Sequence, residues 1–240
     1  MNLVIDIGNS LQKIAVFNND EMVFHQSFSA ISEEILTSVL AQFPVNYSIL
    51  STVAGVDTQV IDFLSINTKM MHYSQQTQLP ITILYKSVET LGLDRIANAV
   101  GAAMQFPNRN VLSIQAGTCL VFDFVNENGA YLGGSISPGI NMRFEALHEK
   151  TKNLPLLRVK NNPQSFLGAT SEESILSGVM NGICCEIDSF IEDYKANFEN
   201  ITVLLTGGDA LCLQKLIKNT IFAAPNLVLI GLNEIIKYNV

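Results

Sequence analysis

The chain has 240 residues, of which 48% are hydrophobic and 15% charged, and its formal net charge is −8 with only 14 Lys and Arg. This length suggests one large domain or two small ones, and the composition supports a full-sized core, which excludes a disordered protein. No basic cluster is present, so we expect no nucleic-acid partner and no anionic membrane surface, because both require concentrated positive charge. No apolar run approaches the roughly 20 residues that span a bilayer, and Asp6 interrupts the apolar N-terminus, so we expect no signal peptide.

The first half of the chain begins with β-structure. Apolar runs and the turn signal at 18–20 predict an antiparallel meander of three strands, over 3–7, 12–17 and 22–28. Helical spacing of apolar residues then predicts a helix over 31–43, which Ser32 can cap. A strand over 47–53 and helices over 57–64 and 93–104 follow.

A second β unit starts at Val111. Its strands are predicted over 111–116, 119–125 and 130–136, with a hairpin turn at 126–129. The remaining elements are a helix opening at about Ile140, a loop over 151–170, a long helix from Ser171 to about Tyr194, a strand over 201–205, a helix over 210–219, a strand over 227–230 and a closing helix over 232–238.

The two β units resemble each other. When the chain is shifted by 109 residues, LVIDIGNS lies over LSIQAGTC, so that Gly8 falls on Gly117 and Asn9 on Thr118. An internal repeat of this size predicts two similar halves that face a shared cleft. No linker rich in Gly, Pro or Ser separates them, so we expect the halves to pack closely.

The segment DIGNS, residues 6–10, predicts a phosphate-binding hairpin. Gly8 lets the backbone turn tightly, and the backbone N–H groups of such a turn form an anion nest. Lys13 follows close enough to reach a phosphate, and Asp6 would hold Mg²⁺ through water. An ordinary hairpin turn favours the same residue types and is the alternative. The pair Gly117-Thr118 repeats the turn, which makes that alternative harder to maintain.

The segment GLDR, residues 92–95, precedes a helical pattern. Asp94 is an ordinary helix N-cap in the simplest interpretation. The functional interpretation is that the helix dipole keeps Asp94 ionised beside a substrate hydroxyl, where a kinase uses a base or an orienting group. Arg95 could then hold a substrate carboxylate by a bidentate pair.

Two further glycine motifs follow, GGSISPG at 133–139 and TGGD at 206–209. The first suggests a close backbone approach to a ligand or partner, and the second could let adenine and ribose lie against bare backbone. A plain connecting loop is the alternative for each. When TGGD is considered by itself, the plain loop is the better interpretation of it.

Together, the ordered set DIGNS, GLDR, a degenerate DxGT (QAGT at 115–118), GGSISPG and TGGDA closely resembles the type III pantothenate kinases of the actin-like ATPase superfamily, from Asp6 to Asp209. The resemblance implies an α/β fold of two ribonuclease-H-like halves, residues 1–108 and 109–240, with mixed sheets around a central nucleotide cleft. It also implies transfer of the γ-phosphate of ATP to pantothenate, the first step of coenzyme A synthesis. Members are cytoplasmic homodimers that need Mg²⁺ and a monovalent cation, K⁺ or NH₄⁺.

The resemblance also assigns roles to residues. Asp94 would be the catalytic base. ATP would be bound by Asp6, Ile7, Gly8, Asn9, Ser10, Leu11, Gln12, Lys13 and Thr118. Pantothenate would be bound by Tyr85, Gly92, Leu93, Asp94, Arg95 and Thr170.

One position departs from the family pattern. The second phosphate motif of the family begins with an Asp that binds the monovalent cation, and this chain has Gln115 there. An amide oxygen can coordinate K⁺, but the lost negative charge weakens cation binding on the order of 1–3 kcal/mol at intermediate dielectric. Asp123 remains in the same β unit, where a solvated strand end is its ordinary interpretation.

Two rival functions stay open. A nucleotide-binding accessory protein without turnover would accommodate Gln115. Another kinase of the superfamily, acting on acetate, a sugar or an N-acetyl sugar, is opposed by the short length and by GLDR.

Overall fold

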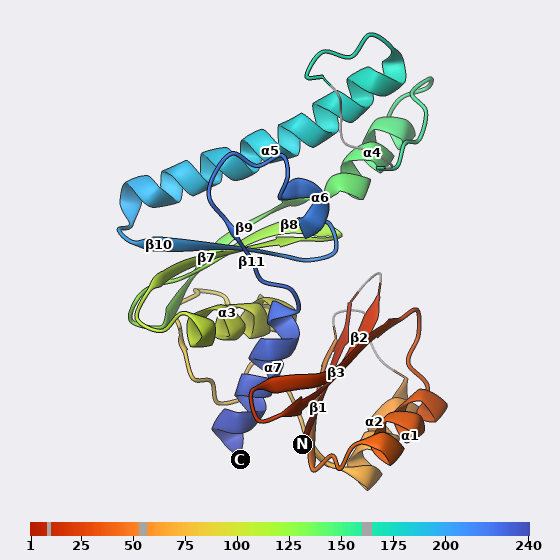
Figure 1. Cartoon of the computed structure of the whole chain (residues 1–240), viewed down its shortest axis with the longest axis vertical. Coiled ribbons are helices and arrows are strands. Elements are labelled where there is room, and N and C mark those ends of the chain that lie inside the picture. Colours follow the sequence, from red (N-terminus) through yellow and green to blue (C-terminus); the bar gives the residue numbers. More distant parts are fainter. Residues whose placement is uncertain (9–10, 53–56, 160–164) are drawn as a thin grey trace. The chain divides into compact units, whose positions relative to one another are not determined.

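The computed structural model describes residues 1–8, 11–52, 57–159 and 165–240 (Figure 1). Two compact units are present: Met1–Pro107 with Asn128–Leu132 and Asn226–Val240, and Asn108–Glu127 with Gly133–Pro225. The elements of the first unit are β1 (Asn2–Ile7), β2 (Gln12–Asn18), β3 (Glu21–Phe28), α1 (Glu33–Gln42), β4 (Tyr47–Thr52), α2 (Thr58–Asn67), β5 (Lys69–Met71), β6 (Thr82–Ile83), the 3₁₀ turn Val88–Thr90, α3 (Leu93–Gln105) and α7 (Leu227–Asn239). Those of the second are β7 (Asn110–Ala116), β8 (Cys119–Val125), most of β9 (Ala130–Pro138), α4 (Ile140–Glu149), α5 (Ser171–Asn197), β10 (Ile201–Thr206), α6 (Ala210–Leu213) and β11 (Phe222–Ala223).

The first sheet has the strand order β3-β2-β1-β4-β5. Its first three strands form the predicted antiparallel meander, whereas β4 and β5 run parallel to β1. On one face, Leu3, Ile5 and Ile7 pack with apolar residues of α1 and α2. The other face receives α3 and α7 (Figure 1). Since side chains alternate along a strand, Asp6 points to the face that α3 and α7 cover.

The second sheet repeats this topology. Read as β9-β8-β7-β10-β11, its order matches that of the first sheet strand by strand, with β7 and β8 antiparallel and β10 parallel to β7. The short strand β6 pairs with the start of β9 at Ala130 and Tyr131, within the first unit. The sequence repeat that superposes residues 3–10 on 112–119 therefore corresponds to the same hairpin at the centre of each sheet.

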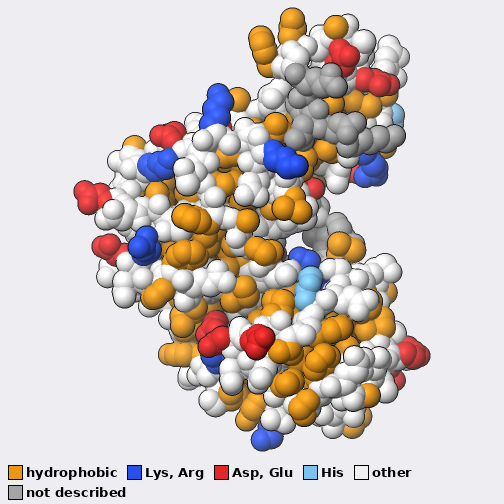
Figure 2. Space-filling view, viewed as in Figure 1, with side chains coloured by type: hydrophobic (Ala, Val, Ile, Leu, Met, Phe, Trp, Pro, Cys, Tyr) orange, Lys and Arg blue, Asp and Glu red, His pale blue; other side chains and the backbone are white. Residues whose placement is uncertain are grey.

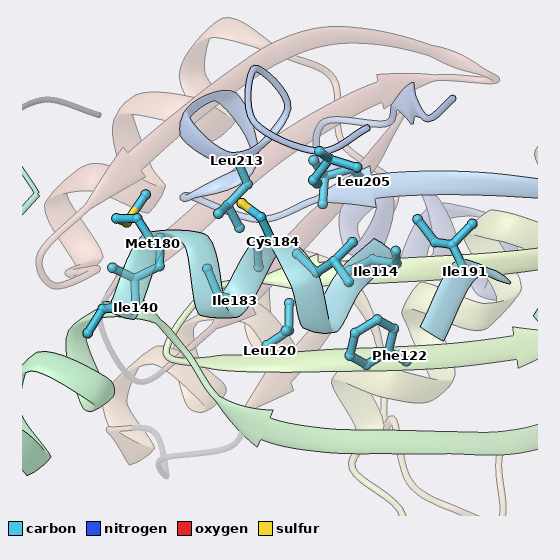
Figure 3. Packing of buried hydrophobic residues seen from close by; sticks show 14 of the residues in the cluster. Ile114, Leu120, Phe122, Ile140, Met180, Ile183, Cys184, Ile191, Leu205 and Leu213 are labelled. Carbon is cyan, nitrogen blue, oxygen red and sulfur yellow. The ribbon is translucent and has the colours of Figure 1, made fainter. Parts of the chain in front are cut away.

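Helix α5 covers the second sheet. Its stripe of Ile175, Val179, Ile183 and Ile187 is buried in a core with residues of β7, β8, β10 and α6, and Figure 3 shows this helix lying across the strands. A capping box at Thr170 starts the helix. Among the described residues, α5 is the one helix with the length and composition to cross a membrane, but this is weak evidence because its apolar stripe is packed on its own sheet.

Helices α3 and α7 cross in direct backbone contact. A Cβ on Gly231 would lie 1.7 Å from the carbonyl oxygen of Ala97, and one on Gly101 would lie 2.4 Å from that of Leu227. Only glycine fits at these two positions. The buried amide of Asn233 further ties α7 to the sheet, because it accepts from Asn2 Nδ2 at 2.9 Å and donates to the Asn19 carbonyl at 2.9 Å.

Two sequence predictions in the C-terminal part are wrong. The strand expected over 227–230 is the first turn of α7. The run LVLI reads as a strand by composition, but the helix is buried on nearly all sides, so its helical period is hidden. The helix expected over 210–219 ends at Leu213. Beyond it, Asp188 of α5 accepts hydrogen bonds from the backbone N–H groups of Lys218 and Asn219, which compete with helix continuation.

We predict that Gly231→Ala destabilises the protein, because the added methyl group must displace the backbone of α3. Overpacking of this kind costs on the order of 1–3 kcal/mol or more, and urea unfolding of the purified protein measures it. Gly178→Ala on α5 is the matched control, since nothing lies within 4 Å of its added Cβ. The control should be neutral or stabilising by about 0.5–1 kcal/mol, and equal losses in both variants would contradict the close crossing.

Candidate active site

The hairpin between β1 and β2 closes tightly beside Asp6. Gly8 N–H donates to the Leu11 carbonyl at 3.2 Å. Asn9 and Ser10, both predicted to bind ATP, lie outside the described residues. In the sheet register, Asp6 is opposite Lys13 on β2 and opposite Ser51 on β4.

Ser51 is fully buried, and its hydroxyl has no hydrogen-bond partner among the residues that the structure describes. It occupies the strand position next to Asp6, so it adds a polar group beside this carboxylate. No sequence signal marks Ser51, because a lone Ser in an apolar strand carries no motif.

Asp94 lies in the first turn of α3, and the N-cap is Gly92. The interpretation of Asp94 as the N-cap itself is therefore wrong by two positions. A Cβ on Gly92 would lie 2.6 Å from Asp94 Oδ1, so the carboxylate folds back over the start of the helix into space that only a glycine leaves free.

The charges of Asp6, Lys13 and Asp94 act on one another. Burial raises the pKa of Asp6 to about 6, the charge of Lys13 opposes this rise, and the charge of Asp94 adds to it. Two carboxylates and one ammonium group thus share the end of β1 and the start of α3. Such a set suits a cation and a phosphate better than an empty site, because the carboxylates repel each other.

Arg95 and Tyr85 are brought together. The guanidinium carbon of Arg95 lies 5.9 Å from the centre of the Tyr85 ring, and this ring is 6.1 Å from that of Tyr131. Arg95 is buried, which is unusual for an arginine and typical of one held for a specific contact. The residue predicted to hold a substrate carboxylate is therefore next to the tyrosine predicted to contact the same substrate.

In the second unit, three glycine loops meet at the turn that follows β7. Gly117 N–H donates to the Cys119 carbonyl at 3.0 Å and Gly139 N–H to the Thr118 carbonyl at 3.1 Å. A Cβ on Gly139 would lie 2.1 Å from the Gly117 oxygen, and one on Gly207, which has φ +97°, would lie 2.1 Å from the Ala116 oxygen. The motifs AGT, SPG and TGG, read separately in the sequence, thus form one backbone cluster.

An ion pair between two helices supports this cluster. Arg143 of α4 donates to the Pro138 carbonyl at 2.8 Å and pairs with Glu186 of α5, which also accepts from the Ser137 hydroxyl. The three side chains fix the peptide that leads into Gly139. No sequence signal marks Arg143 and Glu186, because the two residues are 43 positions apart in the chain.

Gln115 is the penultimate residue of β7, two positions before Gly117, and its side-chain oxygen is buried without a hydrogen-bond partner in the described part of the chain. A neutral oxygen of this kind fits a cation ligand, although it supplies no charge. Asp123 is 1% exposed on β8 and is not the solvated strand end that we expected. Within the described ranges, no group of three or more His, Cys, Asp and Glu side chains could hold a metal on its own.

Thr170 has a structural role in the second unit. Its hydroxyl accepts from Glu173 N–H at 3.2 Å, and the Glu173 carboxylate accepts from the backbone N–H of Thr170 in return. The contact of Thr170 with substrate stays a prediction. Asp94, Arg95 and Tyr85 belong to the first unit, and Thr118, Gln115 and Thr170 to the second.

The fold is shared with several solved structures. An activator of 2-hydroxyisocaproyl-CoA dehydratase from Clostridium difficile, with bound ADPNP, superposes with a TM-score of 0.54 at 12% identity over 99% of this chain and 95% of that one. A glucokinase from an Antarctic psychrotroph gives 0.51 at 12% identity over 100% and 99%. These likenesses confirm the α/β class with two mixed sheets and the actin-like ATPase and sugar kinase fold.

Sequence relatives are more specific. A type III pantothenate kinase from Flavobacterium johnsoniae is 41% identical over 100% of this chain and 99% of its own length. One from Cytophaga hutchinsonii is 42% identical over 100% of both chains. The family described as type III pantothenate kinase matches residues 2–193. The chain therefore belongs to the type III pantothenate kinase family.

Proposed function

We propose that this protein transfers the γ-phosphate of ATP to the primary hydroxyl of pantothenate, with Asp94 as the base. The observation that carries this proposal is the carboxylate of Asp94 at the N-terminal turn of α3, in electrostatic contact with Asp6 at the end of β1. Arg95 and Tyr85 lie beside this turn and would hold the carboxylate and the chain of pantothenate. Asp94 would orient the hydroxyl and accept its proton as the phosphoryl group arrives.

For ATP, we propose binding through the segment Asp6 to Lys13 in the first unit and through Thr118 in the second. Each forms part of a turn that is closed by a backbone hydrogen bond of 3.0–3.2 Å, and we expect backbone N–H groups of the two turns to bind phosphate oxygens. Asp6 would hold Mg²⁺ through water. When bound, Mg²⁺ neutralises charge on the phosphates. The two ribonuclease-H-like halves, residues 1–108 and 109–240, are part of this proposal and are supported by the equal strand order of the two sheets, although α7 packs in the first unit.

Several properties rest on family resemblance. We propose that the protein is a homodimer and lies in the cytoplasm. Light scattering of the purified chain tests the homodimer, and a monomer at assay concentration would contradict it. The stripe on α5 is taken by its own core, whereas Phe166 and Leu167 are 85% and 73% exposed just before Thr170 and offer apolar surface to a second copy. We propose no nucleic-acid partner, on the ground of the net charge of −8; Lys and Arg side chains are scattered over the face in Figure 2.

We predict that Asp94→Asn lowers turnover of pantothenate by ~10²-fold or more, the range for loss of a general base. A coupled assay of ADP release in the presence of ATP, Mg²⁺ and pantothenate measures it. Asp62→Asn, on an exposed position of α2, is the matched control and should be fully active. Near-normal turnover of the Asp94 variant would remove the base from the mechanism.

We predict that Asp6→Asn stabilises the protein without ligand while abolishing turnover. The raised pKa of about 6, against 3.8 in the unfolded chain, means that stability is full below pH 3.8 and falls as the pH rises through 6. The Asn side chain cannot ionise, so the variant should gain roughly 2–3 kcal/mol over wild type at pH 8 and little at pH 4. Urea unfolding at the two pH values measures this, and an equal gain at both would show that charge burial is not its cause.

We predict that the monovalent cation is bound weakly through Gln115. Wild-type turnover should rise with K⁺ or NH₄⁺ over Na⁺, and Gln115→Asp should lower the K⁺ concentration for half activation about tenfold or more by restoring a charge. Gln115→Leu, which keeps the size and removes the oxygen, should lose the activation.

Three results, two from this experiment and one from the same assay with a sugar or acetate in place of pantothenate, would count against parts of the proposal. Equal wild-type turnover in Na⁺ would remove the cation site. No turnover in any salt, with ATP still bound, would favour the accessory protein. Turnover of a sugar or acetate in place of pantothenate would favour another kinase.

A further inference from the structure

Tyr73 lies in a segment that no motif marks, between β5 and β6. Its side chain is 6% exposed, and its hydroxyl donates to the carbonyl of Leu93 at 2.9 Å. Two residues further on, Gln75 Nε2 donates to the carbonyl of Leu91 at 3.4 Å. The segment thus holds the backbone on both sides of Gly92.

The carbonyl that Tyr73 binds belongs to the peptide unit that leads into Asp94. Because a peptide unit is planar, a hydrogen bond to the oxygen of Leu93 also fixes the N–H and Cα of Asp94. The Asp94 carboxylate depends on this direction, since it folds back over Gly92 into a space without room for a Cβ. A small rotation of this peptide would move the carboxylate away from its present place.

The Tyr73 segment is itself anchored. Ser74 N–H donates to Thr77 Oγ1 at 3.0 Å, which closes a turn, and Asn239 Nδ2 of α7 donates to the Gln78 carbonyl at 3.0 Å. These hydrogen bonds hold the segment of Tyr73 in place, so that Tyr73 can restrain the start of α3.

The phenol of Tyr73 is a donor and not a proton acceptor. Burial, and then the charge of Asp94, raise its pKa above the ordinary value, so that it keeps its proton at physiological pH. Its hydrogen bond to a backbone carbonyl uses that proton.

We propose that Tyr73 is a positioning residue for phosphoryl transfer, whose hydroxyl fixes the peptide between Leu93 and Asp94 and so aims the Asp94 carboxylate at the substrate hydroxyl. This inference rests on the proposed role of Asp94 as the base.

Tyr73→Phe tests the proposal, because it removes one oxygen and keeps the ring. We expect turnover to fall roughly tenfold, as for a slightly misplaced catalytic group, while KM for ATP stays within about twofold, because the phosphate turns are untouched. Tyr47→Phe is the matched control and should behave as wild type. Tyr47 is the first residue of β4 and pairs with Asn2, whereas Ser51 near the end of the same strand pairs with Asp6. Gln75→Leu, which changes an exposed residue, should also lower turnover, by a smaller factor. This variant tests the proposal if Tyr73→Phe does not fold.

A double-mutant cycle with Asp94→Asn separates positioning from a general structural effect. If Tyr73 acts through Asp94, Tyr73→Phe should cause no further loss in the Asp94→Asn background. The same tenfold loss in both backgrounds, or wild-type turnover of both Tyr73→Phe and Gln75→Leu, would overturn the proposal. Full turnover of Asp94→Asn alone would overturn the base first, and the role of Tyr73 with it.

Discussion

Contact between bare backbones organises this protein. Gly231 and Gly101 let α3 and α7 cross with main-chain atoms touching, and α3 carries Asp94 at its first turn. In the second unit, Gly139 and Gly207 press equally closely on the turn after β7. A backbone contact has no rotamers to relax, so these crossings fix the elements that bear the chemistry more firmly than side-chain packing would. In the second unit the glycine motifs themselves make the close contact, whereas in the first the contact lies further along α3, at Ala97 and Gly101.

The charges at the end of β1 work against folding. Burial of Asp6 and its closeness to Asp94 make the ionised form costly, as the raised pKa of Asp6 records. A cation and the phosphates of a nucleotide would relieve the same repulsion. Stability is therefore lost in the unliganded protein for a group that becomes favourable with ligand, and this trade-off is common at active sites.

Local signals explain which features could be read from the sequence. Both hairpins follow from alternating apolar residues and turn residues, and the repeat of residues 3–10 at 112–119 correctly indicated one topology used twice. The residues of GLDR were found because the motif is continuous. Tyr73, Ser51 and the pair Arg143–Glu186 were missed because their roles come from partners distant in the chain. The helical period of α7 was hidden by burial on nearly all sides. At Thr170, the sequence led to the prediction of a substrate contact and gave no prediction of the capping box that starts α5.

The path of α7 sets an order for folding during synthesis. The first unit consists of residues 1–107 with the short stretch 128–132 and the C-terminal segment from Asn226, whereas the second lies between Asn108 and Pro225. Chains emerge from the ribosome N-terminus first, so the unit that begins the chain is completed last. Until α7 is made, the face of the sheet near Asp6 lacks one of its two covering helices and exposes apolar surface. The first unit of the nascent chain therefore stays incomplete after all strands of the second unit have been synthesised.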